Sequence, residues 1–139
     1  MSETNRALPP GVLLVPPGAG RHYPCGPMHS EFLADGEESG NRYCVSLWWV
    51  DANQPGPGAH SHEANDELFY VVGGTLTFLV GDQYVDASAG TFLRIPAGVM
   101  HDFENRTEER AGALNVFIPG GFEAQMPEIV AWYAAQAAG

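Results

Sequence analysis

Glycine and proline interrupt this sequence at short intervals, and that pattern constrains the fold more than any other feature. The chain has 17 glycines and 11 prolines among its 139 residues, and they separate short apolar runs. Both residue types are unfavourable inside helices and favourable in turns. About ten short segments alternate with turns in this way, which predicts an all-β sandwich or barrel of antiparallel strands rather than alternating strands and helices.

Turn signals divide the chain into short predicted strands, each an apolar or alternating run between turn-forming residues. The predicted strands cover residues 12–15, 31–34, 42–50, 67–72, 75–80, 83–85, 91–95, 100–105 and 113–118. We expect residues 73–74 and 81–82 to form hairpin turns, residues 35–41 to form a longer turn, and residues 16–27 to be irregular. One carboxy-terminal helix is predicted with Pro127 in its first turn, either as a lid on the barrel or as a partner surface.

Charge and amino-acid usage exclude several functions. The chain has 17 acidic residues against six arginines and no lysine, for a formal net charge of −11. The absence of lysine excludes a Schiff-base lysine and a P-loop lysine. The negative charge, with no basic patch, argues against nucleic acid and anionic membranes as partners. Cys25 and Cys44 are interpreted as small packing residues, not as a disulfide.

The length and the apolar runs indicate a single domain that does not cross a membrane. A chain of 139 residues is within the usual range of one domain. Its apolar runs are much shorter than the ~20 residues that a spanning helix needs. The first ten residues are polar and lack the apolar core of a signal peptide, so we expect a cytoplasmic protein.

Three histidines and one glutamate are spaced as metal ligands would be. His60 and His62 are two residues apart, so an extended backbone directs both imidazoles to the same side. Glu67 begins the next predicted strand, and His101 follows a tight turn at residues 96–98. Three imidazoles and one carboxylate that converge inside a barrel make a nitrogen and oxygen site for a divalent first-row metal.

This pattern resembles the two sequence motifs of the cupin superfamily. The first motif has the form G-x5-H-x-H-x4-E-x6-G and the second the form G-x5-P-x-G-x2-H-x3-N. The matching residues are His60, His62, Glu67 and Gly74 in the first motif, and Gly90, Pro96, Gly98, His101 and Asn105 in the second. Fifteen residues separate the motifs, as in the short form of the family. One departure is Gln54, which stands in place of the leading glycine.

The resemblance implies a double-stranded β-helix, or jelly-roll, barrel with a short carboxy-terminal helix. Residues 12–139 would form one cupin domain, with the motifs at 60–74 and 90–105, after a leading arm at residues 1–11. The implied metal ligands are His60, His62, Glu67 and His101. They would hold one divalent ion (Fe, Mn, Ni, Co, Cu or Zn). The family resemblance also implies a homodimer formed through edge strands or the arm.

Several residues near the motifs allow two interpretations. Glu67 is expected to be a ligand, and as a second role it could take a proton from the substrate. Phe69 and Phe103 share strand parity with Glu67 and His101, so we expect them to line the pocket. Arg94 either clamps an anionic substrate or forms an ion pair outside, and strand parity does not decide between these.

We expect the remaining acidic and histidine residues near these segments to have no role in metal binding. Glu63 and Asp66 are interpreted as solvated loop residues. The alternative is that they form hydrogen bonds to the metal ligands and hold them in place. His22 and His29 have no partner at ligand spacing, so we expect them to be surface or packing residues.

The resemblance is strongest to the small quercetin-dioxygenase-like cupins, through residues 67–72 and 119–123. It implies a metal-dependent dioxygenase or oxidoreductase that acts on a small organic molecule. One alternative is a redox-neutral isomerase, decarboxylase or lyase in which the metal is a Lewis acid. Another is a cupin that binds a small ligand without turnover. The ligand set recurs over many chemistries, so it does not identify the substrate.

Overall fold

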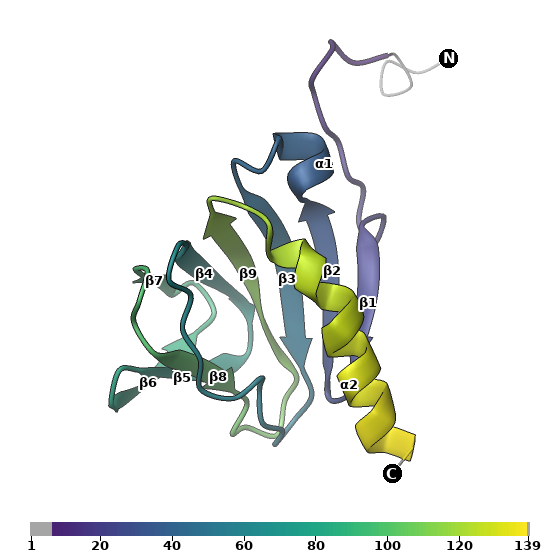
Figure 1. Ribbon diagram of the computed structural model, residues 1–139. Helices are drawn as coiled ribbons and strands as arrows, with labels where there is room; N and C mark the ends of the chain where they lie inside the picture. Colours follow the sequence, from purple (N-terminus) through teal and green to yellow (C-terminus); the bar gives the residue numbers. More distant parts are fainter. Residues whose placement is uncertain (1–6, 139) are drawn as a thin grey trace.

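The computed structural model describes residues 7–138, in which the strands form two antiparallel sheets (Figure 1). The strands are β1 (Arg21–Cys25), β2 (Met28–Ala34), β3 (Cys44–Val50), β4 (Asp66–Gly73), β5 (Thr75–Val80), β6 (Gln83–Ser88), β7 (Phe92–Ile95), β8 (His101–Glu104) and β9 (Ala111–Ile118). One sheet has the order β1-β2-β3-β9-β4-β7 and the other the order β6-β5-β8. The all-β jelly-roll prediction is confirmed.

The chain passes from one sheet to the other at a position where the sequence predicted a hairpin. β4 belongs to the six-stranded sheet and β5 to the three-stranded one, so residues 73–74 carry the chain from one sheet to the other. Gly74 has φ +65°, and a Cβ there would approach the Arg110 carbonyl oxygen to 2.8 Å. The hairpin prediction for residues 73–74 is therefore wrong, whereas residues 81–82 do join the paired strands β5 and β6.

The amino-terminal segment departs from the sequence prediction in two places. Residues 12–15 form no strand, and Leu14 is 69% exposed. Prolines on both sides of this run lack backbone donors, so its apolar residues do not begin a ladder. Residues 16–27, predicted to be irregular, contain β1, an edge strand in which Pro24 is tolerated. Of the leading arm at 1–11, residues 1–6 lie outside the described part.

Alternation along the strands of the larger sheet separates an inner from an outer face. In β2 and β3 every second residue is buried, as expected for strands that cover a core on one side. The inner face holds Phe32, Val50 and Phe117, each at most 2% exposed. In the pairing of β4 with β7, Arg94 lies opposite Leu68, and Glu67 lies opposite the buried Ile95. Arg94 therefore belongs to the outer face.

Two helices contact strands of the larger sheet. α1 (Gly36–Ser39) lies in the segment predicted as a turn, because Asp35 and Glu38 form a capping box. A 3-10 turn, η2 (Phe122–Gln125), leads into α2 (Met126–Ala138), which confirms the predicted carboxy-terminal helix. α2 lies across β1 and β2 in Figure 1, with Met126 fully buried. No helix within residues 7–138 is long and apolar enough to cross a membrane.

Candidate metal centre

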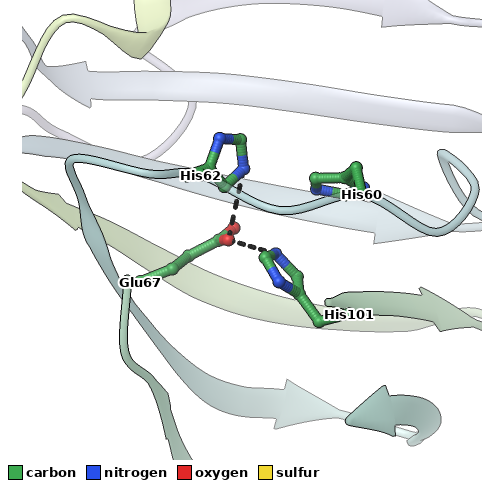
Figure 2. A group of neighbouring side chains, drawn as sticks. All are labelled: His60, His62, Glu67 and His101. Carbon is green, nitrogen blue, oxygen red and sulfur yellow. Dashed lines mark ion pairs between the residues drawn. The ribbon is translucent and has the colours of Figure 1, made fainter. Parts of the chain in front are cut away.

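Three separate segments bring the predicted ligands together (Figure 2). His60 pairs with His101 in an isolated β-bridge, through two backbone hydrogen bonds of 2.9 and 2.8 Å. This bridge fixes the segment that carries His60 and His62 against the start of β8. Glu67 is the second residue of β4, on its inner face. One ligand atom from each of the four side chains lies within 4.8 Å of the others.

Backbone carbonyls orient two of the imidazole rings. His60 Nδ1 lies 2.6 Å from the Gly58 carbonyl oxygen, and His101 Nδ1 lies 2.9 Å from that of Val99. A carbonyl oxygen only accepts hydrogen bonds, so each Nδ1 carries the proton. The neutral tautomer then leaves the Nε2 lone pair of each ring free to bind a metal.

The Glu67 carboxylate is held at one oxygen and free at the other. Its Oε1 accepts a 3.0 Å hydrogen bond from Asn115 Nδ2 on β9. Its Oε2 lies 2.6 Å from His101 Nε2 and 3.6 Å from His62 Nε2. Figure 2 shows this oxygen between the two rings. Asn115 thus fixes the carboxylate so that one oxygen faces the imidazoles.

Three buried atoms of this cluster have no hydrogen bond of normal geometry: His62 Nε2, Glu67 Oε2 and His101 Nε2. Although Glu67 Oε2 and His101 Nε2 are only 2.6 Å apart, this contact is a close ion pair rather than a well-aligned hydrogen bond. No other buried side-chain nitrogen or oxygen of the described residues lacks a partner in this way. Leaving such atoms unpaired is costly, and native structures rarely do so without a reason. Here all three face one another, and a divalent cation among them would satisfy each. The residues present therefore fit a first-row metal ion.

Burial and charge act in opposite directions on two of the imidazoles. Burial lowers the pKa of His62, and the nearby Glu67 carboxylate only partly offsets this effect. Burial also lowers the pKa of His101, but contacts with Glu67 and the Val99 carbonyl outweigh it, so that the pKa is raised overall. A lowered pKa keeps His62 neutral and ready as a ligand. At His101, metal binding competes with a proton.

An apolar cavity of about 60 Å³ adjoins the cluster. Its lining comprises Met28, Trp48, Pro57, His60, Glu67, Phe103, Asn115, Phe117, Phe122, Ile129 and Tyr133. Phe103, which we predicted at the pocket, is among these residues. Phe69 is not: it is 2% exposed and packs against the rings of Phe78 and Phe103. Strand alternation correctly predicted that Phe69 faces inward. However, Phe69 lies two residues further along β4 than Glu67, where core side chains fill the interior and leave no cavity.

Other residues of the motifs have structural tasks. The Asn105 side chain donates to the carbonyls of Val50, Asp51 and Glu109, and so secures the loop after β8. A Cβ at Gly56 would lie 1.6 Å from the Phe103 carbonyl oxygen. Only a glycine fits at position 56, because any side chain would collide with the Phe103 backbone. Gly56 therefore allows this close approach just before the first motif's histidines, although Gln54 replaces the leading glycine of the motif.

The acidic residues beside the ligands lie away from the cluster's free atoms. Asp66 accepts a hydrogen bond of 3.1 Å from the Ala97 backbone, which fixes the turn before His101. Glu63 is exposed. Glu63 therefore matches the prediction of a solvated residue. Asp66 does not, because it begins β4, is half-buried and holds a turn through its carboxylate.

Asn115, Phe122 and Tyr133 also lie at the site, although no sequence motif indicated them there. Asn115 gave a usable signal, since it is a polar residue at an inward position of an otherwise apolar strand. Phe122 stacks on Phe117, with ring centroids 4.4 Å apart, and both rings meet the His62 ring edge to face. The contacts with His62 join segments far apart along the chain, which no local pattern reveals.

Comparison with known proteins gives the same family. Residues 47–117 match the family described as "Cupin domain". An uncharacterized protein of Streptomyces coelicolor is 29% identical over 89 residues, which cover 64% of this chain and 77% of that protein.

Solved structures share the fold at low identity. A predicted oxalate decarboxylase from Thermotoga maritima has a TM-score of 0.72 and 19% identity, over 77% of this chain and 99% of that one. Ectoine synthase from P. lautus has a TM-score of 0.65 and 15% identity, over 77% of this chain and 75% of that one. With half of its length matched by the family profile, this chain belongs to the cupin domain family.

Proposed function

We propose that this cupin is a metal-dependent enzyme of the dioxygenase type that acts on a small organic molecule. The observation that supports this best is the convergence of three unpartnered buried ligand atoms beside an apolar cavity. A divalent first-row metal would supply a Lewis acid and, if it is redox-active, an electron route to O₂. In a dioxygenase reaction both atoms of O₂ enter the organic product, so no further reductant is required.

The chain's own residues would hold the metal and exclude water. His60, His62, His101 and Glu67 are the proposed ligands, through Nε2 of each ring and Oε2 of the carboxylate. Trp48, Phe103 and Phe117 on the cavity wall would keep water away from the substrate body. Glu67 Oε2 is also the atom that would take a substrate proton, if the carboxylate acts as a base. The Asn115 hydrogen bond at Oε1 supports the ligand role, since it holds the carboxylate in one orientation.

The proposed reaction type is that of the small quercetin-dioxygenase-like cupins, but the cavity argues against a substrate as large as a flavonol. A cavity of about 150 Å³ can hold a single benzene ring. The cavity beside Glu67 measures about 60 Å³, and a flavonol has three rings. We therefore propose a much smaller substrate.

Oxygen consumption tests this proposal. The protein would be loaded separately with Fe(II), Mn(II), Co(II), Ni(II) and Zn(II), and screened with small alcohols, enols and hydroxyketones. Substrate-dependent O₂ uptake with a redox-active ion, and none with Zn(II), is the expected result. Turnover under anaerobic conditions with Zn(II) would instead identify redox-neutral Lewis-acid chemistry. Saturable binding with an unchanged ligand under every condition would identify a binding protein.

We also propose that a second copy of this chain covers the outer face of the larger sheet. Apolar side chains are exposed there on three neighbouring strands, namely Tyr70, Val72, Phe92 and Ile118. The net charge of −11 opposes contact between two copies over acidic surfaces. On the outward positions of β3, β9, β4 and β7 the only acidic residue is Asp66, at the margin.

Light scattering after gel filtration tests the dimer. The wild type should elute as a dimer at micromolar concentration, and Tyr70→Lys or Phe92→Lys should elute as a folded monomer. A monomeric wild type, or a dimer that survives both substitutions, would contradict the proposed surface.

A further inference from the structure

The wall of the cavity beside the ligand cluster has almost no charged side chains that could pair with a charged substrate. Its wall consists of aromatic rings, a methionine, a proline and an isoleucine, apart from His60, Glu67, Asn115 and the Tyr133 hydroxyl. The polar groups of the wall are already engaged in part. Asn115 donates to Glu67, and the indole nitrogen of Trp48 donates to Ser46 at 2.9 Å.

The arginines of the described residues all lie elsewhere. Arg21 pairs with Asp35 at 2.9 Å, and Arg106 pairs with Glu104 at 2.7 Å. Arg42 donates to the Ser39 carbonyl, and Arg110 lies over the Trp49 ring. Arg94, the candidate clamp for an anionic substrate, is on the outer face of the sheet opposite Leu68. Within residues 7–138, no arginine lines the cavity.

The charge within the site therefore comes from the metal and one carboxylate. A divalent ion with Glu67 and three neutral imidazoles has a formal charge of +1, so it compensates one negative charge on a bound molecule. A second negative charge would lie against the apolar wall without a partner. Burying an unpaired charge is expensive, and the penalty grows as water is excluded.

We infer that the substrate carries at most one negative charge, at the end that faces the ligands, and an uncharged apolar body. This inference rests on the proposed function, because it assumes that the site holds a divalent metal. It separates this chain from enzymes that act on small dianions, although such enzymes can share the fold. The carboxy-terminal elements contribute Phe122, Ile129 and Tyr133 to this apolar lining.

Butyrate and succinate make a matched pair of probes, since both have four carbons but differ in the number of carboxylates. Their binding to the zinc-loaded protein would be measured by calorimetry at neutral pH. We expect butyrate to bind at least about tenfold more tightly than succinate, because succinate places its second charge in the apolar cavity. Succinate affinity equal to or above that of butyrate would overturn the inference.

Two substitutions on one helix sharpen the test. Ile129 lines the cavity, whereas Trp132, three residues later on α2, is 58% exposed and does not line it. Ile129→Arg puts a cation beside the substrate body and should reduce the butyrate preference to about twofold or less. Trp132→Arg adds the same charge on the solvent side and should leave the preference unchanged. An equal effect of both variants would contradict the inference, since it would indicate long-range charge rather than the cavity wall.

The zinc content of each sample separates this inference from the proposed function. If the zinc-loaded wild type retains one zinc ion and prefers butyrate, but the protein loaded with Fe(II), Mn(II), Co(II) or Ni(II) consumes no O₂ with any substrate in the screen, the charge selection stands and the dioxygenase proposal fails. If the wild type holds no zinc, the assumption beneath the inference is wrong and both proposals fail. Circular dichroism of the two arginine variants identifies any loss of fold.

Discussion

The molecule contains two clusters of histidines, and only one of them is arranged to bind a metal. His22 and His29 lie on β1 and β2, with His22 Nδ1 2.8 Å from His29 Nε2. The other nitrogen of His22 lies 2.8 Å from the Gly18 carbonyl oxygen. Both nitrogens of the His22 ring therefore have protein partners, and its side chain is 44% exposed. In the cluster of His60, His62 and His101, the inward nitrogens of His62 and His101 are buried and unpartnered.

The difference shows that proximity of imidazoles does not by itself make a metal site. The His22–His29 pair has a carboxylate nearby, but Glu31 is 4.0 Å away and accepts a hydrogen bond from the Gly20 backbone. At the other cluster the carboxylate oxygen faces the rings and backbone carbonyls fix the ring tautomers. A metal site is thus recognised by free lone pairs directed to one point, and by partners that hold the ligands from behind.

Removal of one ligand should have the largest effect. His62→Ala or His101→Ala deletes a ligand and should weaken zinc binding by at least about 100-fold, since even changes to residues behind the ligands cost 10–100-fold. His22→Ala should leave the affinity unchanged. Metal content after dialysis against a defined free zinc concentration measures this. Equal content in the His62 and His22 variants would refute the ligand assignment.

Metal binding should stabilise the fold through the cluster of His60, His62 and His101 alone. A ligand present at 100 times its dissociation constant stabilises the native state by about 2.7 kcal/mol. For a chain of this length that corresponds to a rise in Tm of roughly 5–10 °C. EDTA should reverse the rise, and His62→Ala should abolish it, whereas His22→Ala should retain it. Differential scanning calorimetry provides the measurement, and a rise that persists in the His62 variant would contradict the account.

Asn115 should matter because it holds Glu67 from behind. Asn115→Ala leaves Glu67 Oε1 without its donor and should reduce zinc affinity by about 10–100-fold. Asn65, whose side chain donates to the Pro119 carbonyl, provides the control. Asn65→Ala should leave the affinity within about twofold of the wild type. If both variants bind zinc like the wild type, the hydrogen bond to Glu67 is not needed to position the ligand.

The exposed pair of His22 and His29 should make only a small contribution to the pH dependence of the free energy of unfolding. Burial and the charges of His22 and Arg110 lower the pKa of His29 below 6.5. The unfolded chain then takes up a proton at higher pH than the folded one, so this contribution to stability is present above pH 6.5 and is lost as the pH falls.

His29→Gln should therefore make the free energy of unfolding less dependent on pH between about 7 and 5. Urea titrations in EDTA would measure it for the variant and the wild type, because the metal site is then empty in both. An equal or steeper dependence in the variant would contradict the shift at His29.

Residues with a periodic or motif-like pattern were predictable from the sequence. Alternation placed Glu67 on the inner face of β4, and the turn before His101 set where β8 begins. The turns at residues 73–74 and 81–82 look alike in sequence, yet only the second is a hairpin. The difference comes from packing, since Gly74 lies against the backbone of Arg110, far along the chain.

The contacts that support the site from behind, made by Asn115, Phe117 and Phe122, could not be predicted from local sequence patterns. The hydrogen bond from Asn115 to Glu67 spans 48 positions, and the stacking of Phe122 on Phe117 depends on where α2 docks. Strand parity also placed Phe69 correctly on the inner face but could not tell depth along the barrel. Distance along the strand, rather than the face, separates the pocket residue Phe103 from the core residue Phe69.

Anomalous diffraction at the zinc edge, from crystals of the zinc-loaded protein, tests the central claim most directly. We expect one strong peak per chain, about 2.0–2.2 Å from Nε2 of His60, His62 and His101 and from Glu67 Oε2. The space between His22 and His29 should show no peak. A peak at that exposed pair, or no peak among the four proposed ligands, would contradict that claim.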